Sequence, residues 1–300
     1  FEYMGEDPFL AGTLGVAFVR GLQGNDPRYL KVVSTPKHFV ANNEEHNRFE
    51  CDARIPEKIL REYYLPAFEQ CIRKGKDESI MTAYNAINGV PCTVNSWLLQ
   101  KDWGFQGYVV SDCGAPGFLV SHHKYVKTPE VAATLSLKAG LDLECGDHIY
   151  VDPLLNAYRQ YMVTEAEIDS AAYHVLRARM KLGLFDDPEL NPYNRILPGI
   201  VGCEAHKQLA LEAARQSLVL LKNQQHFLPL QADKIKSIAV VGINAGNCEF
   251  GDYSGTPVNE AVSVLEGIRR RVGDRVKVVY APWVSVDAGS ELITKSYFPE

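Results

Sequence analysis

The chain has 300 residues, 46% of them hydrophobic and 23% charged, a composition typical of globular proteins and sufficient for roughly two domains. Its formal net charge is −6 and its basic residues form no long run, so we expect neither nucleic acid nor an anionic membrane as a partner. No apolar stretch approaches the roughly 18 residues of a membrane span. The chain begins at Phe1 without an initiator Met or a recognisable leader, so we expect further sequence before it.

The seven cysteines include no C-x-x-C pair, and no Cys/His cluster has the spacing of a zinc site. We therefore expect no structural zinc, and we predict neither another metal ion nor a cofactor. Most of the cysteines are expected to be small buried residues. Cys113 and Cys145 are exceptions, for reasons given below.

Short β-branched runs alternate with longer helical stretches in residues 1–185, as in βα units around a parallel sheet or barrel. Apolar residues at helical spacing from Pro56 to Cys71 predict a packing helix, and Thr164 begins a capping sequence for another. The predicted strands are Lys31–Thr35, Ser79–Ala83, Tyr108–Ser111 and Ala139–Leu143.

Residues 186–202 are rich in Pro, Asp, Asn and Gly and lack periodicity, which is typical of a linker. Beyond it, Glu204–Leu221 is predicted to be helical, and Ser237–Val241 is predicted to be a strand that ends in a glycine turn. We therefore predict the C-terminal part of one domain in residues 1–185 and the first part of a second α/β domain in residues 203–300.

Polar clusters follow the predicted strands at Lys37-His38, at Tyr84 and at Asp112. A (β/α)8 barrel collects its catalytic groups at these carboxyl ends of its strands. An Asp in this position is, by itself, more often a turn former or a helix cap. The surrounding sequence decides between the two.

Gly104–Val109 has the form Gly-Phe-x-Gly-x-Val, and with Val109–Asp112 it resembles the nucleophile segment of glycoside hydrolase family 3. Other segments resemble the same family in the same order: Tyr3–Pro8, Lys37-His38-Phe39, Arg48, Met81–Asn85 and Asn88-Gly89. The resemblance implies an incomplete (β/α)8 TIM-type barrel followed by the start of an α/β sandwich domain.

The resemblance also implies roles for individual residues. Asp112 would be the nucleophile of a retaining exo-β-glycosidase, which attacks the anomeric carbon while a second, protonated carboxyl about 5 Å away protonates the leaving oxygen. Residues expected to contact the sugar or line its site are Lys37, His38, Arg48, Met81, Tyr84, Cys113 and Ser254. The expected substrate is an oligosaccharide or aryl glycoside, and the oligomeric state is left open.

Each assignment has a plainer alternative. Lys37 and His38 are alternatively a structural pair, Arg48 a surface residue among glutamates, and Tyr84 a packing residue. The Gly-rich loop around Ser254 is alternatively only a turn. The family's general acid/base is a glutamate expected beyond Glu300, and part of the sugar clamp is expected before Phe1, so we predict that this chain alone is inactive.

Cys113 stands where many β-glucosidases of the family carry a Trp that stacks on the sugar. With His123, Tyr125 and Cys145 it forms a pattern similar to the β-xylosidase branch. That similarity implies a Cys113–Cys145 disulfide, which would crowd the position of the glucose hydroxymethyl group and favour xylose. A disulfide also implies an oxidising compartment, so we expect a secreted or periplasmic protein.

Other readings stay open. The cysteines are alternatively reduced and the site accepts glucose. The scaffold could instead belong to a non-catalytic carbohydrate-binding homologue, to a glycan phosphorylase, or to an unrelated barrel enzyme in which Asp112 only caps a helix. The family's N-acetylglucosaminidase branch is disfavoured, because Phe39 continues as Val40-Ala41-Asn42 rather than Pro-Gly-His.

Overall fold

The computed structural model describes residues 4–95, 102–146, 148–251, 253–255 and 257–282. The chain divides into two compact units, unit 1 (Phe1–Arg195) and unit 2 (Ile196–Glu300). The predicted linker, residues 186–202, lies across this division. None of the helices in the described residues is long and apolar enough to cross a lipid bilayer.

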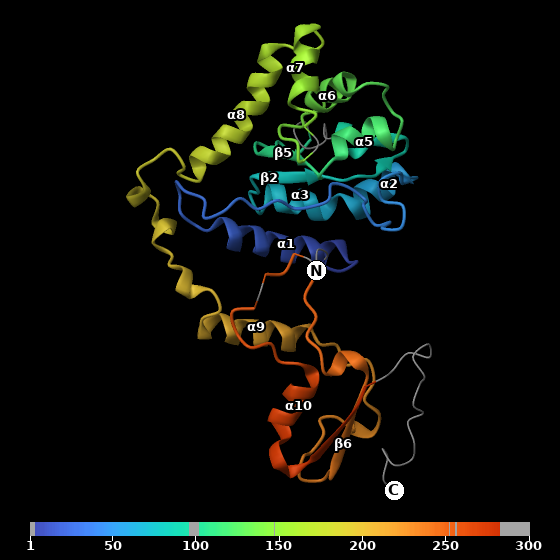
Figure 1. Cartoon of the computed structure of the whole chain (residues 1–300), viewed down its shortest axis with the longest axis vertical. Coiled ribbons are helices and arrows are strands. Elements are labelled where there is room, and N and C mark those ends of the chain that lie inside the picture. Colours follow the sequence, from blue (N-terminus) through green and yellow to red (C-terminus); the bar gives the residue numbers. More distant parts are fainter. Residues whose placement is uncertain (1–3, 96–101, 147, 252, 256, 283–300) are drawn as a thin grey trace. The chain divides into compact units, whose positions relative to one another are not determined.

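Unit 1 mixes helices with short strands (Figure 1). Its described helices are α1 (Pro8–Gln23), α2 (Glu57–Ile59), a π-helical turn (Leu60–Tyr64), α3 (Pro66–Arg73), α5 (Ala115–Ser121), α6 (Pro129–Lys138), α7 (Asp152–Arg159) and α8 (Glu165–Lys181). Its strands are β1 (Asp52–Ala53), β2 (Ser79–Thr82), β3 (Ala86–Ile87), β4 (Val90–Pro91) and β5 (Tyr108–Ser111). Short 3-10 turns lie at Cys92–Val94, Pro188–Leu190 and Pro192–Arg195.

A parallel array lies at the centre of unit 1. β2 and β5 pair in parallel, with Ser79 opposite Tyr108 and Thr82 opposite Ser111. Parallel bridges extend this pair on both sides, from Phe39 to Thr82 and from Val110 to Leu143. Four segments therefore run parallel in chain order, which confirms the α/β class. The array is open in the described residues, so the closed barrel remains a prediction.

The predicted strand at Lys31–Thr35 was wrong. The Lys31 N–H donates instead to the Gln23 carbonyl at the end of α1, at 2.9 Å. Pairing with β2 begins later, where the Met81 N–H donates to the Pro36 carbonyl and the Phe39 N–H donates to the Met81 carbonyl. β2 and β5, by contrast, lie where the β-branched runs placed them.

The predicted helix from Pro56 to Cys71 forms, but a π-helical turn interrupts it. Pro66 has no N–H to donate to the preceding turn and its ring crowds that turn. The backbone widens there, and the Leu65 N–H donates to the Leu60 carbonyl at 2.9 Å. The π turn therefore follows from the position of one proline.

Aromatic residues fill the space between the strands and α3. Phe39 is 1% exposed and makes edge-to-face contacts with Phe68 of α3 and with Trp103. Ile80 of β2 and Val109 of β5 belong to the same buried cluster. This packing fixes the segment that follows Pro36 against β2.

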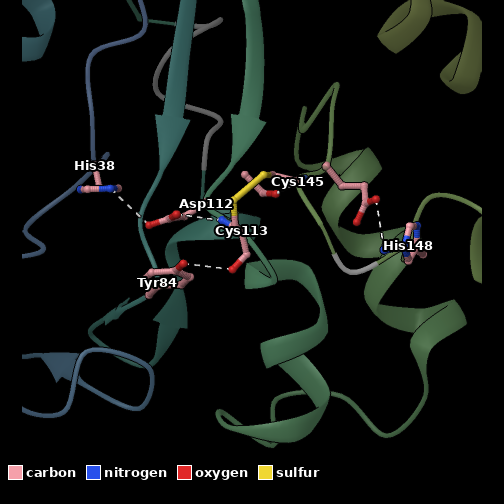
Figure 2. The surroundings of a disulfide bond; sticks show 8 residues. His38, Tyr84, Asp112, Cys113, Cys145 and His148 are labelled. Atoms are coloured by element: carbon pink, nitrogen blue, oxygen red, sulfur yellow. Dashed lines mark hydrogen bonds and ion pairs between the residues drawn. A yellow bond between two sulfur atoms is a disulfide. The ribbon is translucent and has the colours of Figure 1, made fainter. Parts of the chain in front are cut away.

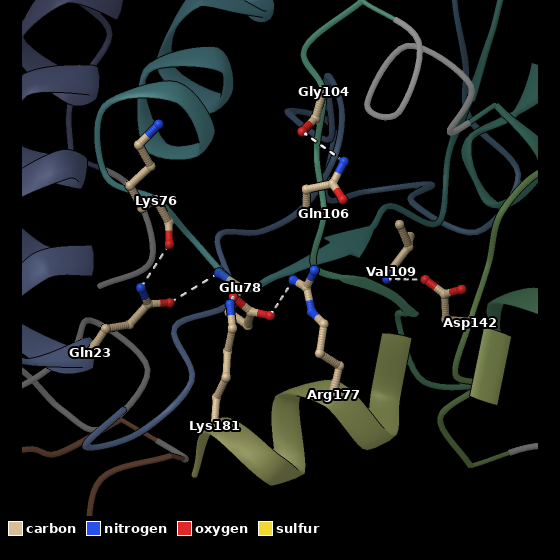
Figure 3. A network of polar contacts seen from close by, with 9 residues as sticks. All are labelled: Gln23, Lys76, Glu78, Gly104, Gln106, Val109, Asp142, Arg177 and Lys181. Carbon is tan, nitrogen blue, oxygen red and sulfur yellow. Dashed lines mark hydrogen bonds and ion pairs between the residues drawn. The ribbon is translucent and has the colours of Figure 1, made fainter. Parts of the chain in front are cut away.

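α8 is attached to the amino end of β2 by ion pairs (Figure 3). Glu78 is 4% exposed and pairs with Arg177 and Lys181, one turn apart on α8. His174, on the same face, lies 2.9 Å from the buried Asp142. The helix begins at the predicted Thr164, whose side chain and that of Glu167 form a capping box.

Unit 2 contains the parallel pair β6 (Ser237–Val241) and β7 (Lys277–Ala281), with α9 (Glu204–Ser217) and α10 (Val264–Val272). Short 3-10 turns lie at Pro198–Ile200, Gln224–His226, Ile243–Ala245 and Gly273–Arg275. α9 begins as predicted but ends at Ser217 rather than Leu221. The predicted strand at Ser237–Val241 is confirmed as β6.

Candidate active site

Asp112 follows β5 directly, and both of its carboxylate oxygens have neighbours (Figure 2). Oδ1 accepts the N–H of Cys113 at 2.8 Å, and Oδ2 lies 3.2 Å from Nε2 of His38. The Asp112 N–H donates to the Thr82 carbonyl at the end of β2. Asp112 is 8% exposed, so its carboxylate, at the carboxyl edge of the array, has little access to water.

His38 approaches Asp112 from the segment that pairs with β2. Its side chain is 9% exposed, and the peptide bond before it is cis. Lys37 and His38 also line a cavity of about 700 Å³ between this segment, α1 and α3. The structure thus places the predicted Lys-His pair at the end of the array, with His38 against the carboxylate.

Cys113 is joined to Cys145 by a disulfide, with the two Cα atoms 4.5 Å apart. The two loops are also linked by hydrogen bonds. The Gly114 N–H donates to the Cys145 carbonyl at 2.7 Å, and the Cys145 N–H donates to Oγ of Ser111 at 3.0 Å. Gly114 turns the chain into α5 with a φ of 81°, a conformation that favours glycine. The expected contact between the two cysteines is therefore present.

The loop beyond Cys145 is pinned by a glutamate. Oε1 of Glu144 accepts the N–H of His148 at 3.1 Å, and Oε2 accepts the N–H of Ile149 at 3.3 Å. Ile149 packs in a buried cluster with α6 and α7. Cys145 is thus linked to Cys113 and Ser111, and the residues after it are linked to Glu144.

Tyr84 packs and also makes a polar contact with the site. Its hydroxyl donates to the Cys113 carbonyl at 3.0 Å, and its ring meets Phe49 and Phe118 at centroid distances of 4.9 and 5.4 Å. The Arg48 guanidinium stacks over the Tyr84 ring at 5.3 Å and pairs with Glu45 at 2.9 Å. Arg48 therefore contacts the Asp112 site through the ring of Tyr84. It also pairs with a glutamate, as expected from its alternative role as a surface residue.

Two predicted site residues have other surroundings. Met81 lies in β2 opposite Val110 and is half-buried. Ser254 is exposed in unit 2, where its N–H donates to the Gly251 carbonyl at 2.8 Å. Its contact with sugar stays a prediction. Tyr3, the first residue of the Tyr3–Pro8 segment, lies outside the described residues.

Two contacts of the site were not anticipated. Ser111 is fully buried and its hydroxyl accepts from Cys145. Nε2 of His123 lies 2.8 Å from the Tyr84 carbonyl. The sequence could have indicated Ser111 as a site residue, because it directly precedes Asp112. The partner of His123 lies on another βα unit, so no neighbouring sequence indicates this contact.

Burial also raises the pKa of two carboxyl groups near the array. Desolvation raises the pKa of Asp142, although hydrogen bonds from His174 and the Val109 N–H act in the opposite direction. Burial raises the pKa of Asp77, at the amino end of β2, to about 8. In the part of the chain that the structure describes, no group of three or more His, Cys, Asp or Glu is placed to hold a metal ion.

The chain is similar in sequence to known proteins. The chain is 36% identical over 331 residues to a β-xylosidase of Formosa agariphila, a match that covers 100% of the chain and 44% of that protein. It is 38% identical over 280 residues to β-D-xylosidase 1 of Arabidopsis thaliana, covering 90% and 36%. The chain thus spans less than half the length of these curated relatives.

Solved structures give the same result. An exo-β-xylosidase of family GH3, in complex with a xylobiose aziridine activity-based probe, superposes with a TM-score of 0.85 at 34% identity, covering 94% of the chain and 37% of that structure. A β-glucosidase from Erythrobacter marinus superposes with a TM-score of 0.82 at 32% identity, covering 94% and 38%. Both sugar specificities are therefore represented among similar structures.

The family models match both parts of the chain. The model of the glycosyl hydrolase family 3 N-terminal domain matches residues 2–178, and that of the family 3 C-terminal domain matches residues 218–295. Together with the relatives, these matches show that the chain belongs to glycosyl hydrolase family 3.

Proposed function

We propose that the full-length protein is a retaining exo-β-glycosidase that releases terminal β-D-xylose through a covalent glycosyl-aspartate at Asp112. The main observation in support of this proposal is the buried Asp112 carboxylate at the end of β5, with Oδ1 accepting the Cys113 N–H and Oδ2 beside His38. A carboxylate held in one orientation is suited to attack an anomeric carbon, because little reorganisation is needed as the bond forms.

The first half of the reaction uses Asp112 as the nucleophile. As the bond from Asp112 to the anomeric carbon forms, the glycosidic bond from that carbon to the leaving oxygen breaks, and this oxygen takes a proton from a second carboxyl group, which we assign to a glutamate of the C-terminal domain. The same glutamate then takes a proton from water, which attacks the anomeric carbon and releases Asp112. His38 and Arg48, as hydrogen-bond donors, are proposed to hold sugar hydroxyl groups during both steps.

Labelling with a 2-fluoro-xyloside tests the nucleophile. In the full-length protein, mass spectrometry is expected to find one label per active site, on Asp112. Asp112→Asn should lower kcat by about 10⁴-fold or more and abolish labelling. Asp142→Asn, which alters another buried aspartate of the same array, should still be labelled. A label on any other residue would remove Asp112 from this role.

The product and its phosphate dependence separate the other candidate classes. Retention predicts that the first xylose released from xylobiose is the β-anomer, detectable by NMR before mutarotation. A non-catalytic carbohydrate-binding protein would show no turnover. Turnover that requires inorganic phosphate and yields xylose 1-phosphate would identify a phosphorylase instead.

Xylose selectivity is proposed to come from the wall formed by Cys113 and Cys145. The disulfide and the hydrogen bonds to Ser111 and Gly114 hold this wall beside Asp112. A sugar with an added hydroxymethyl group would have to displace it, whereas a pentose would not. The β-glucosidases among the similar structures make glucose the competing substrate.

Replacing both cysteines tests the wall. The unaltered protein should have a higher kcat/KM on an aryl β-xyloside than on the matching glucoside. In Cys113→Ala/Cys145→Ala, the relative activity on the glucoside should rise about 10-fold, the size of discrimination that one small group supplies. Cys203→Ala, which removes a free cysteine of unit 2, is the control. An unchanged ratio would contradict the role of the wall.

A secreted or periplasmic location is part of the same proposal. It is supported by the Cys113–Cys145 disulfide, because such bonds persist mainly in oxidising compartments. Cell fractionation with an antibody against the full-length protein tests it. Recovery of the protein only in the cytoplasmic fraction would contradict this location.

A further inference from the structure

His123 lies outside the predicted site, in the connection that follows α5. Its backbone N–H donates to the Phe118 carbonyl at 2.9 Å, which ties the residue to the end of that helix. Its ring turns toward the array, and Nε2 lies 2.8 Å from the Tyr84 carbonyl. A carbonyl only accepts hydrogen bonds, so Nε2 carries the proton and donates. The imidazole is therefore held by a donated hydrogen bond to the segment after β2.

Tyr84 is held at both ends as a result. Its carbonyl accepts from His123, and its hydroxyl donates to the carbonyl of Cys113, the residue after Asp112. Between these two hydrogen bonds, its ring supports the guanidinium of Arg48 at 5.3 Å. Tyr84 is 9% exposed, so little water is available to replace either partner.

We infer that His123 is a positioning residue of the Asp112 site, acting through Tyr84 on the carbonyl of Cys113 and on Arg48. The inference rests on the proposed function. Without the imidazole donor, the Tyr84 carbonyl would be buried without this partner, and the backbone would move to find another. The Tyr84 hydroxyl and ring would move with it, loosening the two groups that they hold.

The neighbouring histidine has different contacts. Nδ1 of His122 lies 2.8 Å from Oγ of Ser121, and its ring packs on Phe118 at 4.3 Å. His122 therefore bonds within its own helix end, whereas His123 bonds across to another βα unit. Geometry rather than residue type therefore distinguishes His123 from His122.

Replacement of His123 in the full-length protein tests the inference. His123→Leu removes the donor, whereas His123→Gln places an amide N–H near the position of Nε2. The number of active sites is first measured with the 2-fluoro-xyloside, and kcat and KM on aryl β-xylosides are then expressed per labelled site. We expect His123→Leu to lower kcat/KM about 10-fold per labelled site, and His123→Gln to restore it to within about threefold.

His174→Leu is the matched control. It also removes a half-buried histidine with a polar partner at 2.9 Å, but that partner, Asp142, belongs to the attachment of α8. We expect this variant to lower Tm and leave kcat/KM per labelled site unchanged. If His123→Leu also changed only Tm or the labelled fraction, its role would be structural and the inference would be overturned.

Two further outcomes are decisive. Failure of His123→Gln to restore the activity lost in His123→Leu would assign the loss to packing and contradict the inference. If His123→Leu does not fold, His123→Asn replaces it, because the shorter amide cannot reach the carbonyl and must show the same loss. Absence of labelling on Asp112 in the unaltered protein would contradict the proposed function itself, independently of His123.

Discussion

Asp77 shows what burial does to a single carboxyl group. It is 5% exposed at the amino end of β2, and desolvation raises its pKa from 3.8 to about 8. The folded protein therefore holds a proton on Asp77 over a pH range in which the unfolded chain has released it.

This proton makes stability depend on pH. Because the folded pKa lies above the unfolded one, the folded state binds more protons between about pH 4 and pH 8, so stability falls as pH rises, by up to about 1.4 kcal/mol per pH unit. Asp77→Asn removes the titrating group. The Tm of Asp77→Asn should therefore exceed that of the unaltered full-length protein by more at pH 8 than at pH 5.

Asp169→Asn, on an exposed position of α8, controls for the substitution itself. Differential scanning calorimetry across pH 5–8 measures both variants. A Tm difference for Asp77→Asn that does not grow with pH would contradict burial of a protonated carboxyl.

Individual residues differ in how far the sequence alone can predict them. Asp112 was predicted because the segment before it has a recognisable form and a strand places it at the sheet edge. The role of His123 could not be predicted, because its partner is a backbone carbonyl 39 residues away. Every residue type has a backbone carbonyl, so the identity of the partner residue does not indicate the contact.

At the scale of elements, α8 is attached to β2 through charged side chains. Arg177 and Lys181 share the carboxylate of Glu78, and Gln23 at the end of α1 accepts the Glu78 N–H (Figure 3). Three elements, α1, β2 and α8, therefore meet at one glutamate. Loss of its charge would leave Arg177 and Lys181 without their buried carboxylate partner.

Glu78→Gln should therefore loosen α8. Breaking a buried ion pair costs about 3–5 kcal/mol, and the partly exposed Arg177 and Lys181 side chains place this case lower, at about 2–3 kcal/mol. Hydrogen exchange should rise in peptides from α8 before it rises in β5. Glu57→Gln, which breaks the exposed pair with Arg61, is the control and should change stability by less than about 0.5 kcal/mol. Unchanged exchange in α8 would refute the attachment.

Elements with one dominant local signal were predicted well. β5 has a β-branched run between turns, and α8 has a capping box, so their beginnings lie where the sequence placed them. The missed features depend on contacts with distant parts of the chain. Lys31–Thr35 looks like a strand locally, but its first N–H is bonded to the end of α1. The helix containing Pro66 continued only because a π turn accommodated the proline.

At the scale of the whole molecule, residues 186–203 span the boundary of the two units, and the parts before and after the boundary differ in their contacts. Residues 186–195 are tied to unit 1: the Tyr193 hydroxyl accepts the N–H groups of Asn25 and Asp26, and Tyr29 donates to Asp186. The following residues, 196–203, begin unit 2 and include exposed apolar side chains such as Leu197. Composition alone made the whole stretch look like one linker.

Limited proteolysis should distinguish the two parts. A protease of broad specificity should cut the full-length protein within residues 196–203 before it cuts within residues 186–195, because the latter must first detach from residues 25–29 before they fit a protease. Tyr193→Phe removes the oxygen that accepts two N–H groups and should extend cleavage into residues 186–195. Mass spectrometry of the early fragments locates the cuts. Equal early cleavage of both parts in the unaltered protein would disprove the difference.

β2 begins beside a cluster of charges and ends beside the proposed reaction centre. Glu78 immediately precedes it, and Thr82 at its other end receives the N–H of Asp112. Thermal stability and the proposed turnover should therefore depend on opposite ends of a strand of four residues. In laboratory evolution of the full-length protein, we expect changes around Glu78 to affect stability and changes around Tyr84 to affect the proposed activity, and the two sets of changes should combine without penalty.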